Sequence, residues 1–191
     1  TCALPICSNA TTTSAWRAAL NANYCNKKMS LVCPAWHTIP SYIQDCSRRL
    51  IETVRLVDRE DTDKNPITEI IFVAHSIPES LDVAGDRYRG DVEMEVDKIR
   101  DAFRGQYKKP IKTSLAYQSS VGPIPWLGPD VQESVRQSTC SNIVVMPISF
   151  VSECIETLHE LDIELQEVAE QASKKMLRVP LISDKSLSRV L

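Results

Sequence analysis

The chain has 191 residues, of which 43% are hydrophobic and 25% are charged, and its formal net charge is −3 at neutral pH. These values are ordinary for a globular protein of one domain or slightly more. The lack of a basic excess argues against nucleic acid as a partner, and no apolar run approaches the ~20 residues of a membrane span. A peripheral membrane contact stays open.

The seven cysteines are scattered along the chain without a C-x-x-C pair. This spacing is not typical of a zinc or iron–sulfur site, and the odd count argues against a disulfide scaffold, so we expect a reducing compartment. Residues 1–6 read TCALPI, and the chain does not begin with Met. We interpret these six residues as derived from a sequencing adapter, and we expect the chain to be a fragment without its N-terminal portion.

The rest of the chain predicts helices and strands in alternation. Helical patterns predict helices over 15–24, 43–58, 91–103 and 131–137, and apolar or β-branched runs predict strands over 28–33, 69–74, 112–119, 143–146 and 177–182. Crossovers of this length are typical of parallel pairing. The sequence therefore predicts an α/β fold with a doubly wound parallel sheet.

Residues 142–172 combine the 143–146 strand with a helix for which Ser152 is the predicted N-cap. A helical wheel places apolar residues on one side, namely Val151, Ile155, Leu158, Leu161, Leu165, Val168 and Ala172. The other side carries glutamates, namely Glu153, Glu156, Glu160, Glu164, Glu167 and Glu170. Like charges three or four residues apart on a helix are mildly destabilising. This acidic stripe is therefore either a solvated surface or a path for a cation.

Candidate functional residues are expected at one edge of the sheet, because ligands of doubly wound sheets bind beyond the carboxyl ends of the strands. His75, the loop 118–129 and the turn before the acidic helix should meet there. His75 is either a buried structural histidine or a proton acceptor, since imidazole titrates near neutral pH. The stiff loop around Trp126 either packs on the protein surface or lines one side of a binding site for a flat apolar ligand. Cys154 and Glu156 offer ligands for a divalent metal.

Four motifs, in this order, resemble the ferrochelatase family: IIFVAHSIPES, GDRY, LAYQSSVGPIPWLGP and PISFVSECIETLHELDIE. The resemblance implies two similar Rossmann-like domains with a porphyrin between them, and insertion of Fe²⁺ into protoporphyrin IX to form haem. It implies that residues 7–42 end the first domain, that 43–165 form the complete second domain, and that 166–191 pack back on the first. Such a fragment alone should be an impaired enzyme, because part of the porphyrin cleft would be missing.

The resemblance also implies the site residues. His75 matches the family histidine implicated in removal of pyrrole protons, and Glu156 matches the carboxylate that faces it across the porphyrin. The implied metal or proton path comprises His75, Cys154, Glu156, Glu160 and Glu164. The implied porphyrin-binding residues are Tyr117, Gln118, Ser119, Val121, Pro123 and Trp126.

The chain departs from the family pattern in two places. Cys154 stands where many members have His, and Arg87 replaces Pro in the usual GDPY motif. Because the chain ends at Leu191 without a cysteine-bearing extension, we expect Fe²⁺ as a substrate and no [2Fe–2S] cluster.

Protoporphyrin IX and ferrous iron are the partners that the resemblance implies. The expected location is the bacterial cytoplasm, with a peripheral contact on the inner membrane left open, or an organelle if the source is eukaryotic. Two alternatives stay open: a chelatase for cobalt or for coproporphyrin, and a non-catalytic carrier of porphyrin or metal.

Overall fold

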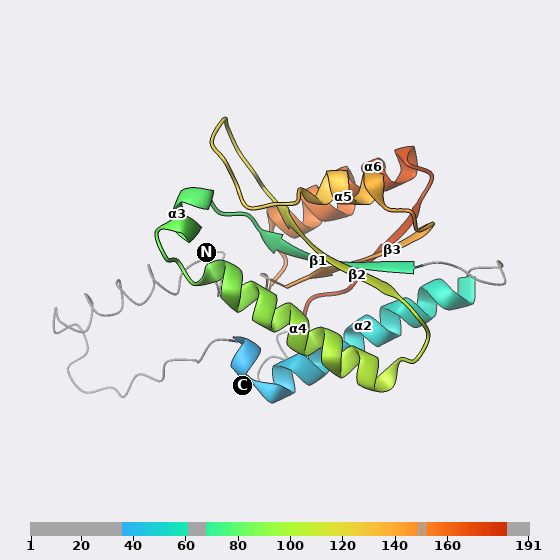
Figure 1. Ribbon diagram of the computed structural model, residues 1–191. Coiled ribbons are helices and arrows are strands. Elements are labelled where there is room, and N and C mark those ends of the chain that lie inside the picture. The colour runs from blue at the N-terminus through green and yellow to red at the C-terminus, as the bar shows by residue number, and fades with distance from the viewer. Residues whose placement is uncertain (1–35, 61–67, 149, 151, 183–191) are drawn as a thin grey trace.

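A four-stranded parallel sheet in the order β2-β1-β3-β4 forms the centre of the computed structural model (Figure 1). Its strands are β1 (Thr68–His75), β2 (Lys112–Gln118), β3 (Asn142–Pro147) and β4 (Lys175–Arg178). The structure describes residues 36–60, 68–148, 150 and 152–182. The helix predicted over 15–24 and the strand predicted over 28–33 lie outside the described residues. The predicted α/β class with a parallel sheet is confirmed.

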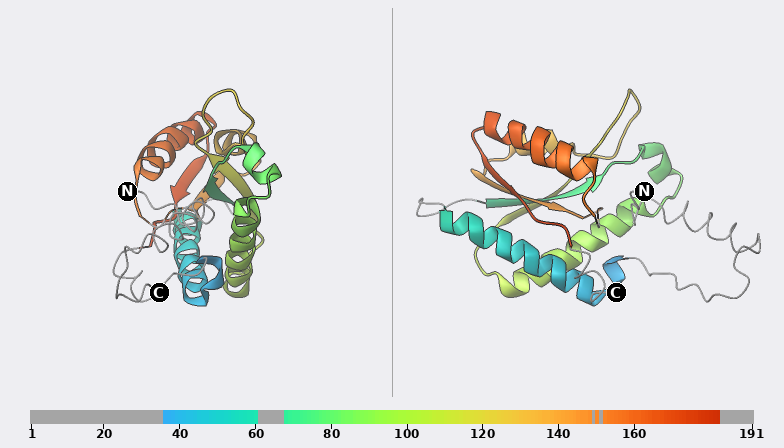
Figure 2. Two further views of the ribbon diagram at one scale, coloured as in Figure 1. Left: turned by 90° about the vertical axis from the view of Figure 1, so that its left-hand side faces the viewer. Right: turned by 180° about the vertical axis from the view of Figure 1, so that it is seen from behind.

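Helices cover both faces of the sheet (Figures 1 and 2). One face carries the two long helices α2 (Pro40–Glu60) and α4 (Tyr88–Gln106). The short helix η1 (Trp36–Thr38) precedes α2, and the short helix α3 (Glu79–Val83) precedes α4. The other face carries α5 (Val131–Gln137), the π-helix η2 (Glu156–Glu164) and α6 (Leu165–Gln171). Within the described part of the chain, no helix is both long and apolar enough to cross a membrane.

The central strands β1 and β3 are buried at every position except His75. Their side chains alternate between two apolar clusters, as the period of a strand requires. Ile70 and Phe72 pack with α2 and α4, whereas Ile71 and Val73 pack with α5, η2 and α6. Because both faces are covered, the centre of each strand, residues 70–74 and 143–146, is a continuous apolar run instead of alternating apolar and polar residues.

The connections between strands create a topological switch at the centre of the sheet. The chain leaves β1 for β2 through α4 on one face, and it returns from β2 to β3 through α5 on the other. It then continues outward to β4 through η2 and α6. The carboxyl ends of β1 and β3 therefore flank the point where the winding reverses, which is the usual ligand position in such sheets. His75 is the last residue of β1.

The expected domain limits fall within continuous helical segments. The limit between residues 42 and 43 lies inside α2, and the limit between 165 and 166 lies where η2 has just continued into α6. The last predicted strand, 177–182, is observed as β4 over 175–178, because Pro180 lacks the N–H that would extend the ladder. Since β4 pairs with β3, residues 175–178 belong to this sheet. Packing of residues 183–191 on another domain concerns a part of the chain outside the described residues.

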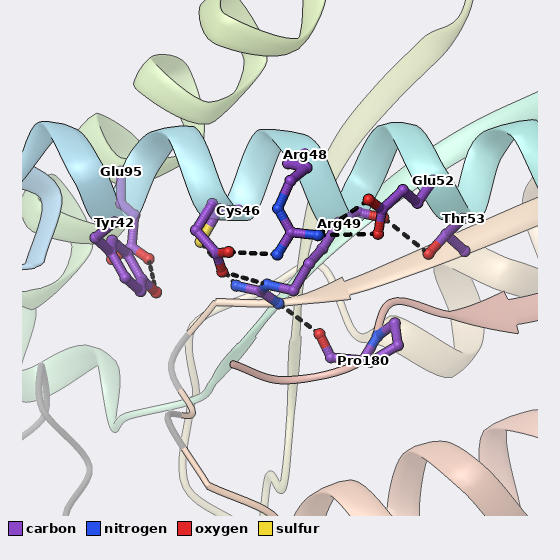
Figure 3. A network of polar contacts seen from close by, with 9 residues as sticks. Tyr42, Cys46, Arg48, Arg49, Glu52, Thr53, Glu95 and Pro180 are labelled. Carbon is purple, nitrogen blue, oxygen red and sulfur yellow. Dashed lines mark hydrogen bonds and ion pairs between the residues drawn. The ribbon is translucent and has the colours of Figure 1, made fainter. Parts of the chain in front are cut away.

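A polar network joins α2 to α4 and to the segment after β4 (Figure 3). The Tyr42 hydroxyl donates a 2.9 Å hydrogen bond to Oε1 of Glu95, which is completely buried. Asp45 accepts hydrogen bonds from Arg48 and Arg49, and Arg49 also donates to the carbonyl of Pro180. Polar side chains thus link α2 to its two neighbours within an otherwise apolar layer.

Burial dominates the chemistry of Glu95. Removal from water raises the pKa of this carboxyl to about 8, and the nearby charge of Asp91 acts in the same direction. The hydrogen bond from Tyr42 opposes the shift without cancelling it. The Glu95 carboxyl is therefore mostly protonated in the folded protein at neutral pH.

We predict that Glu95→Gln flattens the dependence of stability on pH. The Glu95 carboxyl loses its proton near its ordinary pKa of 4.5 in the unfolded chain, whereas the folded protein keeps the proton up to a pH of about 8. The folded state therefore binds more protons between these values, and this group lowers stability by about 1.4 kcal/mol per pH unit as pH rises through the window. Gln resembles the protonated carboxyl and does not titrate. Urea denaturation at pH 5, 6.5 and 8 should show a stability difference in favour of the variant that grows with pH.

Glu93→Gln is the matched control, because Glu93 lies on the same helix and is exposed. Its pH profile should follow that of the unmodified chain. Parallel profiles for the unmodified chain and Glu95→Gln would contradict the prediction.

Candidate functional site

His75 and Gln118 stand side by side at the carboxyl ends of β1 and β2. The two residues are partners in the parallel register, and the backbone N–H of Ser76 donates a 2.8 Å hydrogen bond to the Gln118 carbonyl. The odd-numbered residues of β1 face η2 and α6, so His75 lies on that side of the sheet. A polar side chain is tolerated here because the buried core of the strand has just ended.

The helix after β3 differs from the sequence prediction. It begins at Glu156 instead of after Ser152, and its first nine residues form a π-helix in which Leu165 N–H donates to the carbonyl of Glu160, five residues back. A π-helix has more residues per turn than the 3.6 assumed by an α-helical wheel. The predicted apolar side is therefore wrong at its start: Ile155 is 72% exposed and Leu158 is 50% exposed.

The π-helix turns Glu160 towards the end of β2. Its Oε2 accepts a 2.6 Å hydrogen bond from the Ser119 hydroxyl and a 3.1 Å hydrogen bond from Nε2 of Gln118. The same Nε2 donates at 3.0 Å to the backbone carbonyl of Glu156. Gln118 and Ser119, which we expected to bind porphyrin, thus make their hydrogen bonds to η2 in this structure.

Electrostatics link His75 to these carboxylates. Burial lowers the pKa of His75, and the negative charges of Glu160 and Glu156 oppose that shift without overcoming it. A hydrogen bond from the Cys154 thiol lowers the pKa of Glu156, and a positive charge on His75 acts in the same direction once the imidazole is protonated. The site therefore places an imidazole that can accept a proton beside carboxylates whose negative charge would stabilise the resulting imidazolium.

The outer members of the acidic stripe do not join this group. Glu164 lies 3.3 Å from Nδ1 of His159, and both side chains are about half exposed. Glu167 and Glu170 are exposed. Among the described residues, no three or more His, Cys, Asp or Glu side chains come together closely enough to hold a metal ion. Of the residues of the predicted path, Glu156 and Glu160 lie close enough to His75 to affect its pKa, and Cys154 affects that of Glu156; the path itself stays a prediction.

The loop after β2 projects from the same edge of the sheet (Figure 1). Its base is fixed to the residues after β1, since Leu127 N–H donates to the Ile77 carbonyl at 3.0 Å. Nε1 of Trp126 donates to the Val121 carbonyl at 3.0 Å, which closes the loop on itself. Val121 and Pro123 are exposed and Trp126 is partly exposed. The loop thus carries exposed side chains at this edge of the sheet, and its role as a wall for a flat apolar ligand stays a prediction.

Tyr117 lies elsewhere. It is 3% exposed and packs in the apolar cluster between the sheet, α2 and α4, on the opposite face from Gln118. Alternation along β2 requires this, because neighbouring residues of a strand point to opposite faces. The structure therefore places Tyr117 in the core beneath the loop, instead of on its exposed wall.

Arg178 of β4 is a residue that the sequence analysis did not identify. Its guanidinium donates to both carboxylate oxygens of Asp162, at 2.5 and 2.8 Å, and to Oε1 of Glu153 at 3.2 Å. The other Glu153 oxygen accepts a 2.7 Å hydrogen bond from Thr157. Arg178 thus attaches two places to the sheet: the turn before η2, through Glu153, and the outer side of η2, through Asp162. No sequence motif indicates this contact, because β4 and η2 meet only in the folded chain.

The described residues thus form an α/β domain with a parallel sheet that carries a histidine and two carboxylates at its carboxyl edge. The chain belongs to the ferrochelatase family, since the family model described as Ferrochelatase matches residues 2–188. The match begins at residue 2, within the segment that we expected to be derived from an adapter.

Curated relatives agree with the family match. The chain is 38% identical over 159 residues to a ferrochelatase of Trichodesmium erythraeum, a match that covers 80% of this chain and 38% of the relative. It is 36% identical over 155 residues to a ferrochelatase of Synechocystis sp., covering 78% of this chain and 38% of the relative. The chain thus spans about two fifths of the length of these relatives.

We predict that Arg178→Lys loosens the attachment of η2. A lysine cannot reproduce the two parallel hydrogen bonds to Asp162 together with the third to Glu153. The free energy of unfolding should fall by about 1–2 kcal/mol, as expected for loss of charged hydrogen bonds that are partly shielded from water. Arg136→Lys is the control, because its ion pair with Glu133 is exposed and should contribute little. Equal losses for the two variants, measured by urea denaturation, would contradict the proposed role of Arg178.

Proposed function

We propose that this chain contributes to the insertion of Fe²⁺ into protoporphyrin IX, with ferrous iron and the porphyrin as substrates. Family membership supports the reaction class. The observation that carries the proposal for this chain is the combination of His75, whose pKa burial lowers, with the carboxylates of Glu156 and Glu160 at the switch point of the sheet. Metal insertion requires both a proton acceptor and a negative site for a cation.

The proton balance gives each residue a role. Metallation replaces the two pyrrole N–H protons of the porphyrin by the metal, so two protons must leave. His75 accepts one pyrrole proton and passes it to solvent before it accepts the second, and the negative charges of Glu160 and Glu156 stabilise the imidazolium that forms each time. The same carboxylates attract the cation and replace part of its water shell. Cys154 offers a softer ligand beside Glu156, and Glu164 is the outermost carboxylate of the path.

The porphyrin is proposed to lie against the loop that follows β2. Val121, Pro123 and Trp126 present apolar surface beside the acidic group, and the backbone bonds at the base of the loop hold that surface in place. A flat macrocycle that contacts this wall would bring its pyrrole nitrogens near His75. Stiff walls of this kind also resist relaxation of a distorted ligand.

Absorption spectroscopy tests the proposed function. The 191-residue chain is mixed with protoporphyrin IX, and anaerobic Fe²⁺ or Zn²⁺ is then added. We expect a shift of the porphyrin spectrum on binding, followed by conversion to the metalloporphyrin spectrum faster than in a protein-free sample. A shift without conversion would identify a porphyrin carrier and contradict the proposal. If the chain metallates coproporphyrin faster than protoporphyrin IX, or inserts Co²⁺ faster than Fe²⁺, that compound or ion replaces the proposed substrate.

We predict that His75→Ala abolishes most of the metallation rate and leaves porphyrin binding in place. A well-placed general base contributes about 10²–10⁴-fold, and the loss should fall in that range. The rate is measured from formation of the metalloporphyrin and binding from the initial spectral shift. Loss of binding in parallel with the rate would instead assign His75 to the porphyrin pocket.

Glu156→Gln and Glu170→Gln separate the cation path from a solvated helix surface. Glu156→Gln removes the charge beside His75, so it should depress turnover strongly, and extra Fe²⁺ should rescue it poorly. Glu170 is exposed on α6, and its substitution should be nearly silent. Turnover is compared across a series of Fe²⁺ concentrations. If neither substitution affects turnover, the acidic stripe is a solvated surface and the cation-path proposal fails.

A further inference from the structure

The end of β2 holds η2 through two adjacent side chains. Nε2 of Gln118 donates to the Glu156 carbonyl at 3.0 Å and to Oε2 of Glu160 at 3.1 Å. The Ser119 hydroxyl donates to the same Oε2 at 2.6 Å. One carboxylate oxygen thus receives two hydrogen bonds from consecutive residues, and the first turn of η2 is fastened through its backbone as well.

This contact persists despite two local costs. Ser119 has a φ of 64°, in the left-handed region that is strained for a residue with a side chain. Oε1 of Gln118 is buried and has no hydrogen-bond partner among the residues that the structure describes. An unpaired buried oxygen and a strained backbone, side by side, indicate that this geometry is held for a purpose other than local stability.

We propose that Gln118 and Ser119 are positioning residues for the reaction, and that they hold the Glu160 carboxylate at the site of His75. This inference rests on the proposed function, and it assigns to the two residues a task other than contact with porphyrin. With Oε2 occupied, Oε1 of Glu160 is the oxygen left to meet a cation or the imidazolium of His75. A carboxylate fixed in this way does not have to reorient when the cation arrives, and this strengthens binding of the cation.

Ser119→Gly provides a sharp test, because it separates the hydroxyl from the backbone. Glycine adopts a φ near +64° without strain, and this relief offsets part of the stability lost with the hydrogen bond, so the variant should fold with little change in stability. It nevertheless loses the hydrogen bond to Glu160. If Ser119 has the proposed role, Ser119→Gly raises the KM for Fe²⁺ about tenfold and changes kcat less. A tenfold rise is the effect expected for the loss of one hydrogen bond to a charged group. Gln118→Leu should raise the KM further, because it removes both of the contacts made by Nε2.

Ser114→Ala is the matched control. Ser114 lies on the same strand, near its other end, and its hydroxyl donates a 2.7 Å hydrogen bond to Oε1 of Glu69. The substitution removes the same type of bond far from the site. It should lower the midpoint of thermal unfolding and leave the KM for Fe²⁺ unchanged, the reverse of the pattern expected for Ser119→Gly.

Hydrogen exchange provides a readout that does not depend on turnover. Amides of residues 156–165 should exchange faster in Ser119→Gly and Gln118→Leu than in the unmodified chain, and Ser114→Ala should leave them unchanged. Isothermal titration with Zn²⁺ should show weaker binding in the first two variants. Unchanged exchange would overturn the inference, as would faster exchange with unaltered Zn²⁺ affinity. If the unmodified chain does not metallate porphyrin, the proposed function fails, while exchange and Zn²⁺ affinity still decide whether these residues position Glu160.

Discussion

Parallel pairing of β1 with strands on both sides is the constraint from which the rest of the structure follows. The neighbouring strands satisfy the backbone groups of β1, and helices on both faces bury its apolar centre, residues 70–74. The titratable residues of β1 lie at its two ends: Glu69 is buried with hydrogen-bond partners near the start, and His75 stands where the buried run ends. Because the winding of the sheet reverses between β1 and β3, this end is also where neighbouring loops leave space for a ligand.

The π-helix decides which side chains meet His75. Its wider turn leaves Leu158 on the surface, and Glu160 hydrogen-bonds to the end of β2. Such a helix is rare and frequently occurs at functional sites. Here it is held from two sides: the end of β2 bonds its inner side, and Arg178 of β4 bonds its outer side. The sheet thus imposes a geometry that the helix would not keep alone.

Burial gives opposite results for the two kinds of titratable group in this domain. It lowers the pKa of His75 and raises that of Glu95, since the charged form is disfavoured in both cases. At neutral pH, the histidine at the rim is therefore ready to accept a proton, whereas the acid beneath the sheet is uncharged and serves as a partner for Tyr42. Glu156 of the π-helix is less buried, and a hydrogen bond from the Cys154 thiol lowers the pKa of its carboxyl beside the neutral imidazole.

The sequence alone determined the architecture and the candidate residues. Apolar runs identified the central strands, helical spacing identified α2, α4 and α5, and the position of His75 after a buried strand placed it at the ligand edge. Those features were predictable because burial and periodicity are local properties of the chain. The start of η2, the burial of Tyr117, the contacts of Gln118 and Ser119, and the role of Arg178 were decided only by the tertiary structure. Each depends on a contact between segments distant in sequence, and the π-helical turn breaks the 3.6-residue period on which the helical wheel relied.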